Sequence, residues 1–359
     1  MAKVNGTKKI DTITIKDASN VIVITNKKPT SYKINKNGKN YIFGNAGKDT
    51  IIVKGGKKNY IYGDDKNGTA SAIDTITVNK GSSNKIYGGK GNDKFFIKGG
   101  TGNTITGGNG NDTFTIRGGK KTVLSGGAGS DSFIYVKSKK NATVTIKDYK
   151  YGENGTGDTF TVRKAAVSGL TASGKNLKFT IGKGSVTLTK AVDASVYVND
   201  NRGGYWVYVA GDGSFGSVSL DKEFTGTTFD AGNFKPVTGI YANSEKALTL
   251  KGNANGNDIY GGNYNDTLYG KGGNNTLYGG SGNDTFVFDA TSKGTNTIND
   301  YNAGDIIAFS GGIGYNNVPS SDNDVILNLT TGGTIKIVGA KGNEITFNLN
   351  GKTTRETFS

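Results

Sequence analysis

The feature that most constrains this 359-residue chain is a repeat of nineteen residues in its first half. A turn aspartate recurs as Asp49, Asp74, Asp93, Asp112 and Asp131, at intervals of 25, 19, 19 and 19 residues. The longer first interval contains an insertion, "DDKNGTASAI", directly after the glycine at position 63. Repetition at a fixed period indicates supersecondary units that stack on one another and bury a shared core.

Apolar residues alternate with polar ones at matched positions of every repeat, which is typical of half-buried strands. Each repeat therefore predicts a coil with two short strands and two turns. One turn edge carries the aspartates, and the opposite edge carries Asn40, Asn59, Asn84, Asn103 and Thr122. The matched apolar columns are Ile51, Ile76, Phe95, Phe114 and Phe133, then Val53, Val78, Ile97, Ile116 and Tyr135, and Ile42, Ile61, Ile86, Ile105 and Leu124.

The composition agrees with an all-β chain of short strands and glycine turns. There are 58 glycines and 3 prolines, and the chain is rich in the β-branched and aromatic residues that suit strands. Cysteine and histidine are both absent. Disulfides, thiolate or imidazole metal sites and histidine-based catalysis are therefore excluded.

A second, shorter array occupies residues 252–288, with turn residues Asp258, Asp266, Asn275 and Asp284. We expect Asp266 and Asp284 to lie one coil apart, and Asp258 to face Asn275. Similar phrases, "VTIKDYKYGENGTGDTF" and "NTINDYNAGDIIAF", follow the two arrays, which indicates a duplicated module of array plus cap. The expected organisation is N-terminal cap strands (1–37), first array (38–143), cap and β region (144–208), linker and β segment (209–251), second array (252–290), and C-terminal cap with a secretion signal (291–359).

The residues of these turns predict a bound cation. A reversal within six residues needs positive φ angles, hence the glycines. Stacked aspartates at the strand spacing of ~4.8 Å repel one another by about 1 kcal/mol per pair even in water. Calcium accepts carboxylate and carbonyl oxygens in a tolerant geometry, whereas magnesium demands a strict octahedron. The alternative is that each aspartate only caps its own loop as an Asx turn.

The pattern G-G-x-G-x-D occurs at Gly88, Gly107, Gly126 and Gly279, with looser copies in register. These nonapeptides resemble those of the RTX family of calcium-binding, type I-secreted bacterial proteins. The resemblance covers about residues 38–160 and 252–309. It implies a parallel β-roll, a β-solenoid with two repeat arrays, each closed by a capping β region.

The resemblance also implies that each calcium is shared by two successive turns of one edge. One turn contributes its second and fourth motif residues and its aspartate to the shared calcium. The next turn contributes its first and third motif residues and its aspartate. The implied groups are Gly89, Gly91 and Asp93 with Gly107, Asn109 and Asp112; Gly108, Gly110 and Asp112 with Gly126, Ala128 and Asp131; and Gly262, Tyr264 and Asp266 with Gly279, Ser281 and Asp284. The candidate metal-site residues also include Asp49, Asp74, Gly88, Lys90, Gly127, Gly129 and Asp258.

The turns of this chain depart from the family pattern. Family rolls usually carry aspartate on both edges, whereas here one edge carries asparagine, whose amides can bond to one another without a metal. We therefore expect the asparagine edge to be metal-free. The insertion after position 63 interrupts the pair Asp49 and Asp74, where Asp64 or Asp65 are the alternative ligands.

The net charge of +15 also departs from the acidic family pattern. Residues 1–150 hold 27 Lys and Arg against 10 Asp and Glu, and the lysines crowd the asparagine edge. They form either a solvated face that keeps the β-protein soluble or a cationic stripe for an anionic polysaccharide or cell-surface glycan. No nucleic-acid recognition motif and no apolar run long enough for a membrane span are present.

Taken together, the sequence predicts a secreted calcium-binding β-roll that folds outside the cell, and not an enzyme. Two alternatives remain open: a surface adhesin or anionic-glycan-binding module, and the C-terminal targeting segment of a larger RTX toxin or enzyme. The N-terminus lacks the apolar region of a cleaved signal peptide. The C-terminal "ETFS" resembles the uncleaved export signal of type I substrates. Secretion by that route to the cell surface or the medium is therefore expected.

Overall fold

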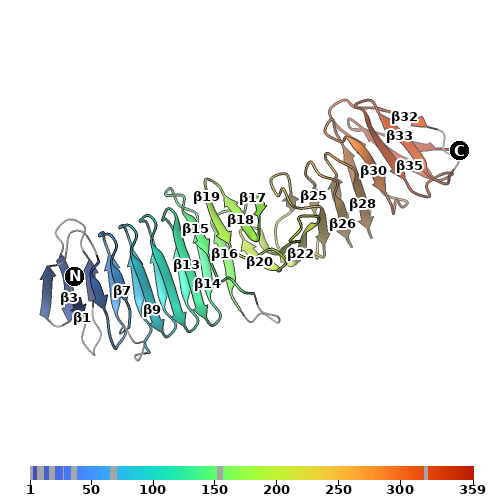
Figure 1. The fold of residues 1–359 in the computed structure, drawn as a ribbon. Coiled ribbons are helices and arrows are strands. Elements are labelled where there is room, and N and C mark those ends of the chain that lie inside the picture. Colours follow the sequence, from blue (N-terminus) through green and yellow to red (C-terminus); the bar gives the residue numbers. More distant parts are fainter. Residues whose placement is uncertain are drawn as a thin grey trace. The chain divides into compact units, whose positions relative to one another are not determined.

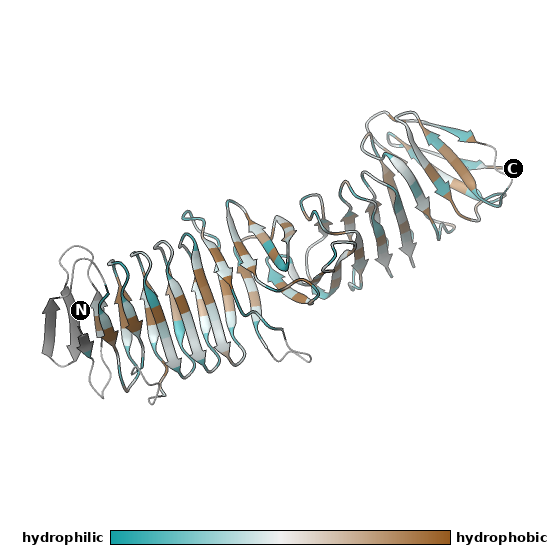
Figure 2. Ribbon diagram, in the orientation of Figure 1, coloured by the Kyte–Doolittle hydropathy of each residue, from teal (hydrophilic) through white to brown (hydrophobic). Residues whose placement is uncertain are grey.

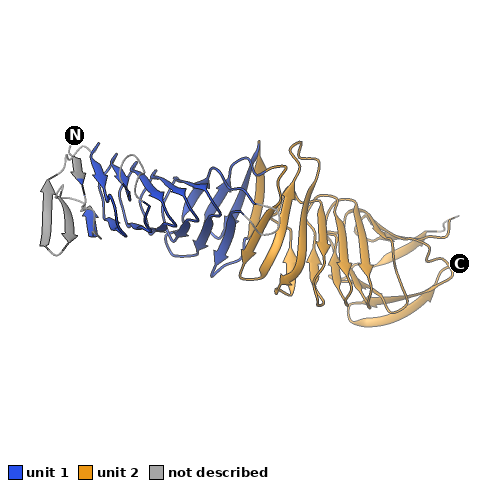
Figure 3. Cartoon of the chain, turned by 90° about the horizontal axis from the view of Figure 1, so that it is seen from below, with its two compact units in different colours: residues 1–167, 175–191 blue, residues 168–174, 192–359 orange. Residues whose placement is uncertain are grey.

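The computed structural model describes residues 3–5, 12–15, 21–26, 28–33, 39–64, 71–151, 157–318 and 322–359. All regular elements in these residues are β-strands. The chain divides into two compact units, which are considered separately (Figure 3). Unit 1 comprises residues 1–167 and 175–191, and unit 2 comprises residues 168–174 and 192–359.

Unit 1 is a solenoid in which every coil contributes one strand to each of two sheets (Figure 1). In both sheets the strands of successive coils pair in parallel, in the register that the nineteen-residue repeat predicts. The first sheet contains β1 (Lys3–Asn5), β5 (Tyr41–Phe43), β7 (Tyr60–Tyr62), β9 (Lys85–Lys90), β11 (Thr104–Asn109), β13 (Thr122–Ala128) and β15 (Thr143–Ile146). The second contains β2 (Thr12–Ile15), β6 (Thr50–Val53), β8 (Thr75–Val78), β10 (Lys94–Ile97), β12 (Thr113–Ile116), β14 (Ser132–Val136) and β16 (Thr159–Arg163).

The core of unit 1 consists of the predicted columns. Residues of all three apolar columns are buried, and Phe95, Phe114 and Phe133 stack with ring centroids 4.7 and 4.9 Å apart. Figure 2 shows brown, hydrophobic segments at matching places on the stacked strands. Each coil adds one buried apolar side chain to each of the three columns, so the core continues along the stack.

Antiparallel elements close the two ends of unit 1. At the N-terminal end β2 pairs in parallel with β6. β3 (Val21–Asn26) pairs antiparallel with β2, and β4 (Lys28–Lys33) pairs antiparallel with β3. Strands thus occur where the sequence predicted a starting cap. At the other end the hairpin of β18 (Asn176–Ile181) and β19 (Gly184–Leu188) pairs through β19 with the last coil.

Unit 2 repeats this plan. Residues 209–251, expected as a linker and β segment, contain strands that begin the second stack. Its first sheet holds β20 (Val196–Asp200), β21 (Gly203–Val209), β22 (Gly216–Phe224), β24 (Gly239–Ala242), β26 (Asp258–Gly262), β28 (Asn275–Gly280), β30 (Gly294–Ile298), β34 (Gly333–Ile337), β33 (Val325–Leu329) and β32 (Tyr315–Val318). Its second sheet holds β23 (Thr228–Asp230), β25 (Thr249–Lys251), β27 (Thr267–Tyr269), β29 (Thr285–Phe288), β31 (Ile306–Phe309), β35 (Glu344–Leu349) and β36 (Lys352–Thr357), and β17 (Gly169–Ser173) also belongs to this unit.

The two caps are built alike. In unit 2 the hairpin of β33 and β34 pairs through β34 with β30, just as β19 pairs with β15 in unit 1. In each cap the first strand of the hairpin, β18 or β33, pairs antiparallel with the free edge of the second strand, β19 or β34. An exposed parallel edge would offer unpaired backbone groups to other chains, and the hairpin moves that edge onto a cap.

Candidate metal centre along the aspartate edge

The turn aspartates of unit 1 form one continuous column. The backbone N–H of each donates to the Oδ1 of the aspartate in the next coil, with N to Oδ1 distances of 2.7 Å from Asp74 to Asp93, 2.7 Å from Asp93 to Asp112 and 2.8 Å from Asp112 to Asp131. The N–H of Asp49 donates to Asp74 Oδ1 at 2.7 Å. The insertion therefore leaves the column intact.

The second oxygen of the Asp93 and Asp112 carboxylates is buried and accepts no hydrogen bond from the part of the chain that the structure describes. Asp93 and Asp112 are each 1% exposed, and their Oδ2 atoms have no partner within the described residues. A buried carboxylate oxygen that accepts nothing is costly, because desolvation is not compensated. The same holds in the two arrays for Asp74, Asp131, Asp266 and Asp284.

Glycine and a backbone carbonyl lie beside each of these oxygens. A Cβ added to Gly107 would collide with both Asp112 Oδ2 and the carbonyl oxygen of Gly126 in the next coil. Gly88 stands in the same relation to Asp93 Oδ2 and the carbonyl oxygen of Gly107. The first motif position is therefore glycine because a carboxylate oxygen and a carbonyl oxygen converge where a side chain would begin.

Burial changes the acidity of the column. Desolvation raises the pKa of Asp93 from 3.8 to about 8 and that of Asp112 to about 7. The backbone hydrogen bond from the preceding coil lowers each pKa in part, and the neighbouring aspartates raise it further. The column thus disfavours negative charge unless a cation is present.

The second array has the same aspartate edge. The N–H groups of Asp266 and Asp284 donate to the Oδ1 atoms of Asp284 and Asp305 at 2.7 and 2.8 Å. Desolvation raises the pKa of Asp266 to about 7 and that of Asp284 to about 6. A Cβ on Gly261 would approach both Asp266 Oδ2 and the carbonyl oxygen of Gly279, so the arrangement of unit 1 recurs.

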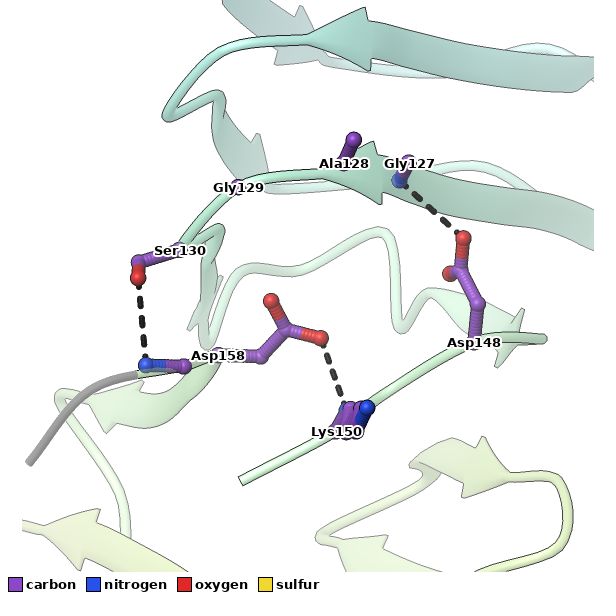
Figure 4. Close-up of a pocket in the computed structure, with 8 residues that line it drawn as sticks. Gly127, Ala128, Gly129, Ser130, Asp148, Lys150 and Asp158 are labelled. Carbon is purple, nitrogen blue, oxygen red and sulfur yellow. Dashed lines mark hydrogen bonds between the residues drawn. The ribbon is translucent and has the colours of Figure 1, made fainter. Parts of the chain in front are cut away.

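The column of unit 1 ends at Asp158, whose two oxygens are both satisfied. Its Oδ1 accepts the N–H of Asp131 at 2.9 Å and its Oδ2 accepts that of Lys150 at 2.8 Å. Asp148 accepts the N–H groups of Gly126 and Gly127, each at 3.0 Å. These groups border a pocket of about 540 Å³ (Figure 4), lined by Gly127, Ala128, Gly129, Ser130, Asp148, Lys150, Gly157 and Asp158.

The second array ends with an equivalent pair. Asp305 accepts the N–H groups of Asp284 and Asn302, and Asp300 accepts those of Gly279 and Gly280 at 2.9 Å. These four terminal aspartates were not among the residues that the sequence predicted to be functional. The signal was present in the repeated phrases "KDY" and "NDY", each followed by a later Gly-Asp.

The opposite edge of unit 1 is an asparagine ladder. The Nδ2 of Asn40 donates to Asn59 Oδ1 at 2.8 Å, and the Nδ2 of Asn84 donates to Asn103 Oδ1 at 3.2 Å. The expected amide-to-amide bonding is therefore confirmed. Asn84 Oδ1 also accepts the backbone N–H of Asn59 at 3.0 Å, so Asn84 makes the bond that an aspartate makes and one more through its Nδ2.

One alignment predicted for the second array is wrong. Asn257, not Asp258, faces Asn275: the N–H of Asn257 donates to Asn275 Oδ1 at 2.9 Å, and Asn257 is buried. Asp258 is the first residue of β26 and its side chain is exposed. The coil period is 18 residues here, and burial of the amide decides the register. The asparagine edge of unit 2 therefore consists of Asn257, Asn275 and Asn296.

The remaining candidate ligands lie in the turns between the coils. The carbonyl oxygens of Gly89 and Gly91 lie against Gly108 and Gly110, where a Cβ would collide with them. The carbonyl oxygen of Asn109 accepts the N–H of Gly91 at 2.8 Å, and that of Ala128 accepts the N–H of Gly110 at 2.8 Å. In the second array the carbonyl oxygen of Gly262 accepts the N–H of Ser281 at 2.8 Å, and Tyr264 is 41% exposed.

The donor set fits a hard cation. Each step of the aspartate edge offers carboxylate oxygens and glycine carbonyls, the ligands that calcium prefers. In the described residues no group of three or more His, Cys, Asp or Glu side chains is arranged around one point. A cation here would accordingly be held by carboxylates of successive coils together with backbone carbonyls.

Comparison with known proteins identifies these turns. A family model for the RTX calcium-binding nonapeptide repeat matches residues 36–57, 72–102, 96–119 and 251–289. The chain therefore carries RTX calcium-binding nonapeptide repeats in both units, as the sequence predicted. No curated protein sequence matches the chain.

One solved structure with limited similarity is the crystal structure of the extracellular lipase LipA from Serratia marcescens. The sequence identity is 17% and the TM-score is 0.20, over 81% of this chain and 43% of that one. The chain thus spans less than half the length of that protein.

Proposed function

We propose that this chain, which carries RTX calcium-binding nonapeptide repeats, is an extracellular protein whose two β-rolls complete their folding when calcium binds along the aspartate edges. The role of calcium is structural. The ion supplies positive charge between stacked carboxylates, and the chain's own residues position it. No catalytic role is assigned to these aspartates, because they are committed to the turns.

The observation that carries this proposal is the unpartnered Oδ2 of each interior aspartate. Asp93 and Asp112 bury one carboxylate oxygen each with no donor among the described residues, beside a glycine carbonyl of the next coil. An ionised carboxylate in that position destabilises the fold unless a cation neutralises it. Asp93 and Asp112 with Gly107, and Asp112 and Asp131 with Gly126, would hold such ions.

Calcium suits these sites better than magnesium. The ligands are carboxylates and backbone carbonyls on a repeating backbone, which permit several coordination numbers but not a strict octahedron. Extracellular calcium modules commonly bind at about 10⁻⁴–10⁻³ M, so such a roll stays loose where calcium is scarce and folds where it is abundant. This supports export of a loosely folded chain, followed by folding outside the cell.

The test is to follow secondary structure and thermal stability while calcium is added to protein prepared in EDTA at pH 8. We expect the β-sheet signal and the melting temperature to rise with calcium and to respond weakly to equal magnesium. Identical far-UV circular dichroism spectra and identical melting temperatures in EDTA and in millimolar calcium would remove the basis for the proposal.

A further inference from the structure

The loops of the asparagine edge in unit 1 concentrate positive charge. Eleven Lys and Arg and no Asp or Glu occur in five successive loops, at residues 54–59, 79–84, 98–103, 117–122 and 137–142. All eleven side chains are exposed. They are Lys54, Lys57, Lys58, Lys80, Lys98, Arg117, Lys120, Lys121, Lys137, Lys139 and Lys140.

The solenoid arranges these cations in rows along the stack. Parallel bridges join Lys57 to Ser82, Ser82 to Thr101 and Thr101 to Lys120, so these four residues occupy one row. Lys98 and Arg117 occupy a second row, because their N–H groups bond to the carbonyl oxygens of Val78 and Ile97 in the preceding coils. Neighbouring positions in a row are ~4.8 Å apart, as in any parallel sheet.

Four of these side chains form no ion pair with any described residue that would account for their presence. Within the described residues, no ion pair joins Lys54, Lys57, Arg117 or Lys120 to a carboxylate. The loops are held instead by main-chain bonds, such as that from the N–H of Lys120 to the carbonyl oxygen of Gly100 at 2.9 Å. Stacked like charges repel one another, so a purely structural role does not account for them.

Unit 2 supplies an internal comparison. Its equivalent loops, residues 252–257, 270–275 and 289–296, contain only two basic residues, Lys271 and Lys293. Lys271 forms an ion pair with Asp289 at 2.9 Å. The same type of edge with the same asparagine ladder therefore forms without a cationic row. The charge on unit 1 is an added property of its surface, which the coil architecture does not require.

We propose that the asparagine edge of unit 1 binds a linear anionic polysaccharide, with its carboxylate or sulfate groups lying along the rows of Lys and Arg. A polyanion with regularly spaced charges matches a row with regularly spaced cations, and its binding relieves their mutual repulsion. Ser82, Ser83 and Thr101 lie exposed or partly exposed among the cations and offer hydrogen bonds to sugar hydroxyls.

The edge is less suited to other polyanions. The five loops contain no aromatic residue, whereas single-stranded nucleic acids are held by stacking of bases on aromatic side chains. The loops also lack the large apolar residues that insert into a lipid surface. The tyrosines of the adjacent sheet stack on one another, Tyr41 on Tyr60 and Tyr62 on Tyr87, each at 4.9 Å, so these contacting faces are not open to bases.

The test compares two matched variants in calcium. The edge variant carries Lys54→Gln, Lys57→Gln, Arg117→Gln and Lys120→Gln. The control variant loses four equally exposed cations outside these loops, through Lys48→Gln, Lys94→Gln, Lys147→Gln and Lys178→Gln. Both are first shown by circular dichroism to fold as the unmodified protein does. Binding of chondroitin sulfate is then measured over a range of NaCl concentrations, with uncharged dextran as the negative control.

We expect binding of chondroitin sulfate that weakens with salt, a loss of about tenfold or more in the edge variant, and little change in the control variant. Equal losses in the two variants would overturn the proposal, because binding would then depend on net charge alone. Tighter binding of duplex DNA than of chondroitin sulfate, lost in the edge variant, would also overturn it and assign the edge to nucleic acid. A fold that proves independent of calcium leaves this experiment unaffected.

Discussion

Replacing Asp112 by Asn should stabilise the calcium-free protein and destabilise the calcium-loaded protein. Asp112 Oδ1 accepts the N–H of Asp93 at 2.7 Å, and an asparagine Oδ1 makes the same bond on the opposite edge. The substitution therefore keeps the acceptor and removes a buried charge. It also places an Nδ2 donor at the position of Asp112 Oδ2, which has no hydrogen-bond partner among the described residues.

The magnitude follows from the acidity of the carboxyl. Raising the pKa of Asp112 from 3.8 to about 7 corresponds to at most about 4 kcal/mol of destabilisation when the folded protein is ionised. Because the turns border solvent, screening reduces the expected effect to about 2 kcal/mol. In EDTA at pH 8, Asp112→Asn should be more stable than the unmodified protein by that amount. In saturating calcium it should be less stable, because two sites lose a charged ligand.

Urea unfolding followed by circular dichroism in EDTA and in calcium measures both effects, and elemental analysis of dialysed protein counts the ions. The matched control is Asp258→Asn, which removes the same charge from an exposed position outside the column. It should change neither stability nor calcium content. The reasoning fails if Asp112→Asn destabilises the protein equally in EDTA and in calcium.

Two further predictions concern pH and the asparagine edge. In EDTA the folded state holds protons on Asp93 and Asp112 that the unfolded state releases, because their folded pKa values of about 8 and about 7 exceed 3.8. The contribution of these groups to the metal-free melting temperature should therefore be largest below about pH 4 and should fall as the pH rises through 7 to 8. Calcium should suppress this fall. A metal-free melting temperature that rises over this range would contradict the prediction. Replacing Asn84 and Asn103 together by Ala leaves the backbone N–H and the Nδ2 of Asn59 short of acceptors, at a cost of about 1–3 kcal/mol per unpaired buried group. Calcium content should stay the same, and anomalous scattering peaks between the asparagine turns of a crystal would refute this assignment.

The sequence was sufficient to predict the columns and their register in unit 1. Phe95, Phe114 and Phe133 share one position of an unbroken nineteen-residue repeat, and any other register would take them out of the core. The position of the aspartates relative to the apolar columns follows from the same repeat. The aspartate and asparagine edges could therefore be distinguished from the amino-acid sequence alone.

The register of the second array was harder to predict because its turns are less regular. The segment "NGND" offers an asparagine and an aspartate in adjacent positions, and either satisfies a loose motif. Only burial separates them, since Asn257 turns inward and Asp258 outward. The terminal aspartates Asp148 and Asp300 were missed for another reason. They lie outside the repeat and bond to it only through groups of the last turn, chiefly its backbone N–H groups.

Comparing the two edges shows where the proposed calcium requirement would originate. Asn84 uses Oδ1 to accept a backbone N–H and Nδ2 to donate to the next coil, so the asparagine ladder is complete by itself. Asp93 makes the first bond but has an oxygen in place of the donor, so each interior step of the aspartate ladder lacks one positive partner. At the end of the column Asp158 finds that partner in the N–H of Lys150. The proposed dependence on a cation is therefore confined to the interior steps. It follows from replacing a single amide nitrogen by oxygen in an otherwise equivalent ladder.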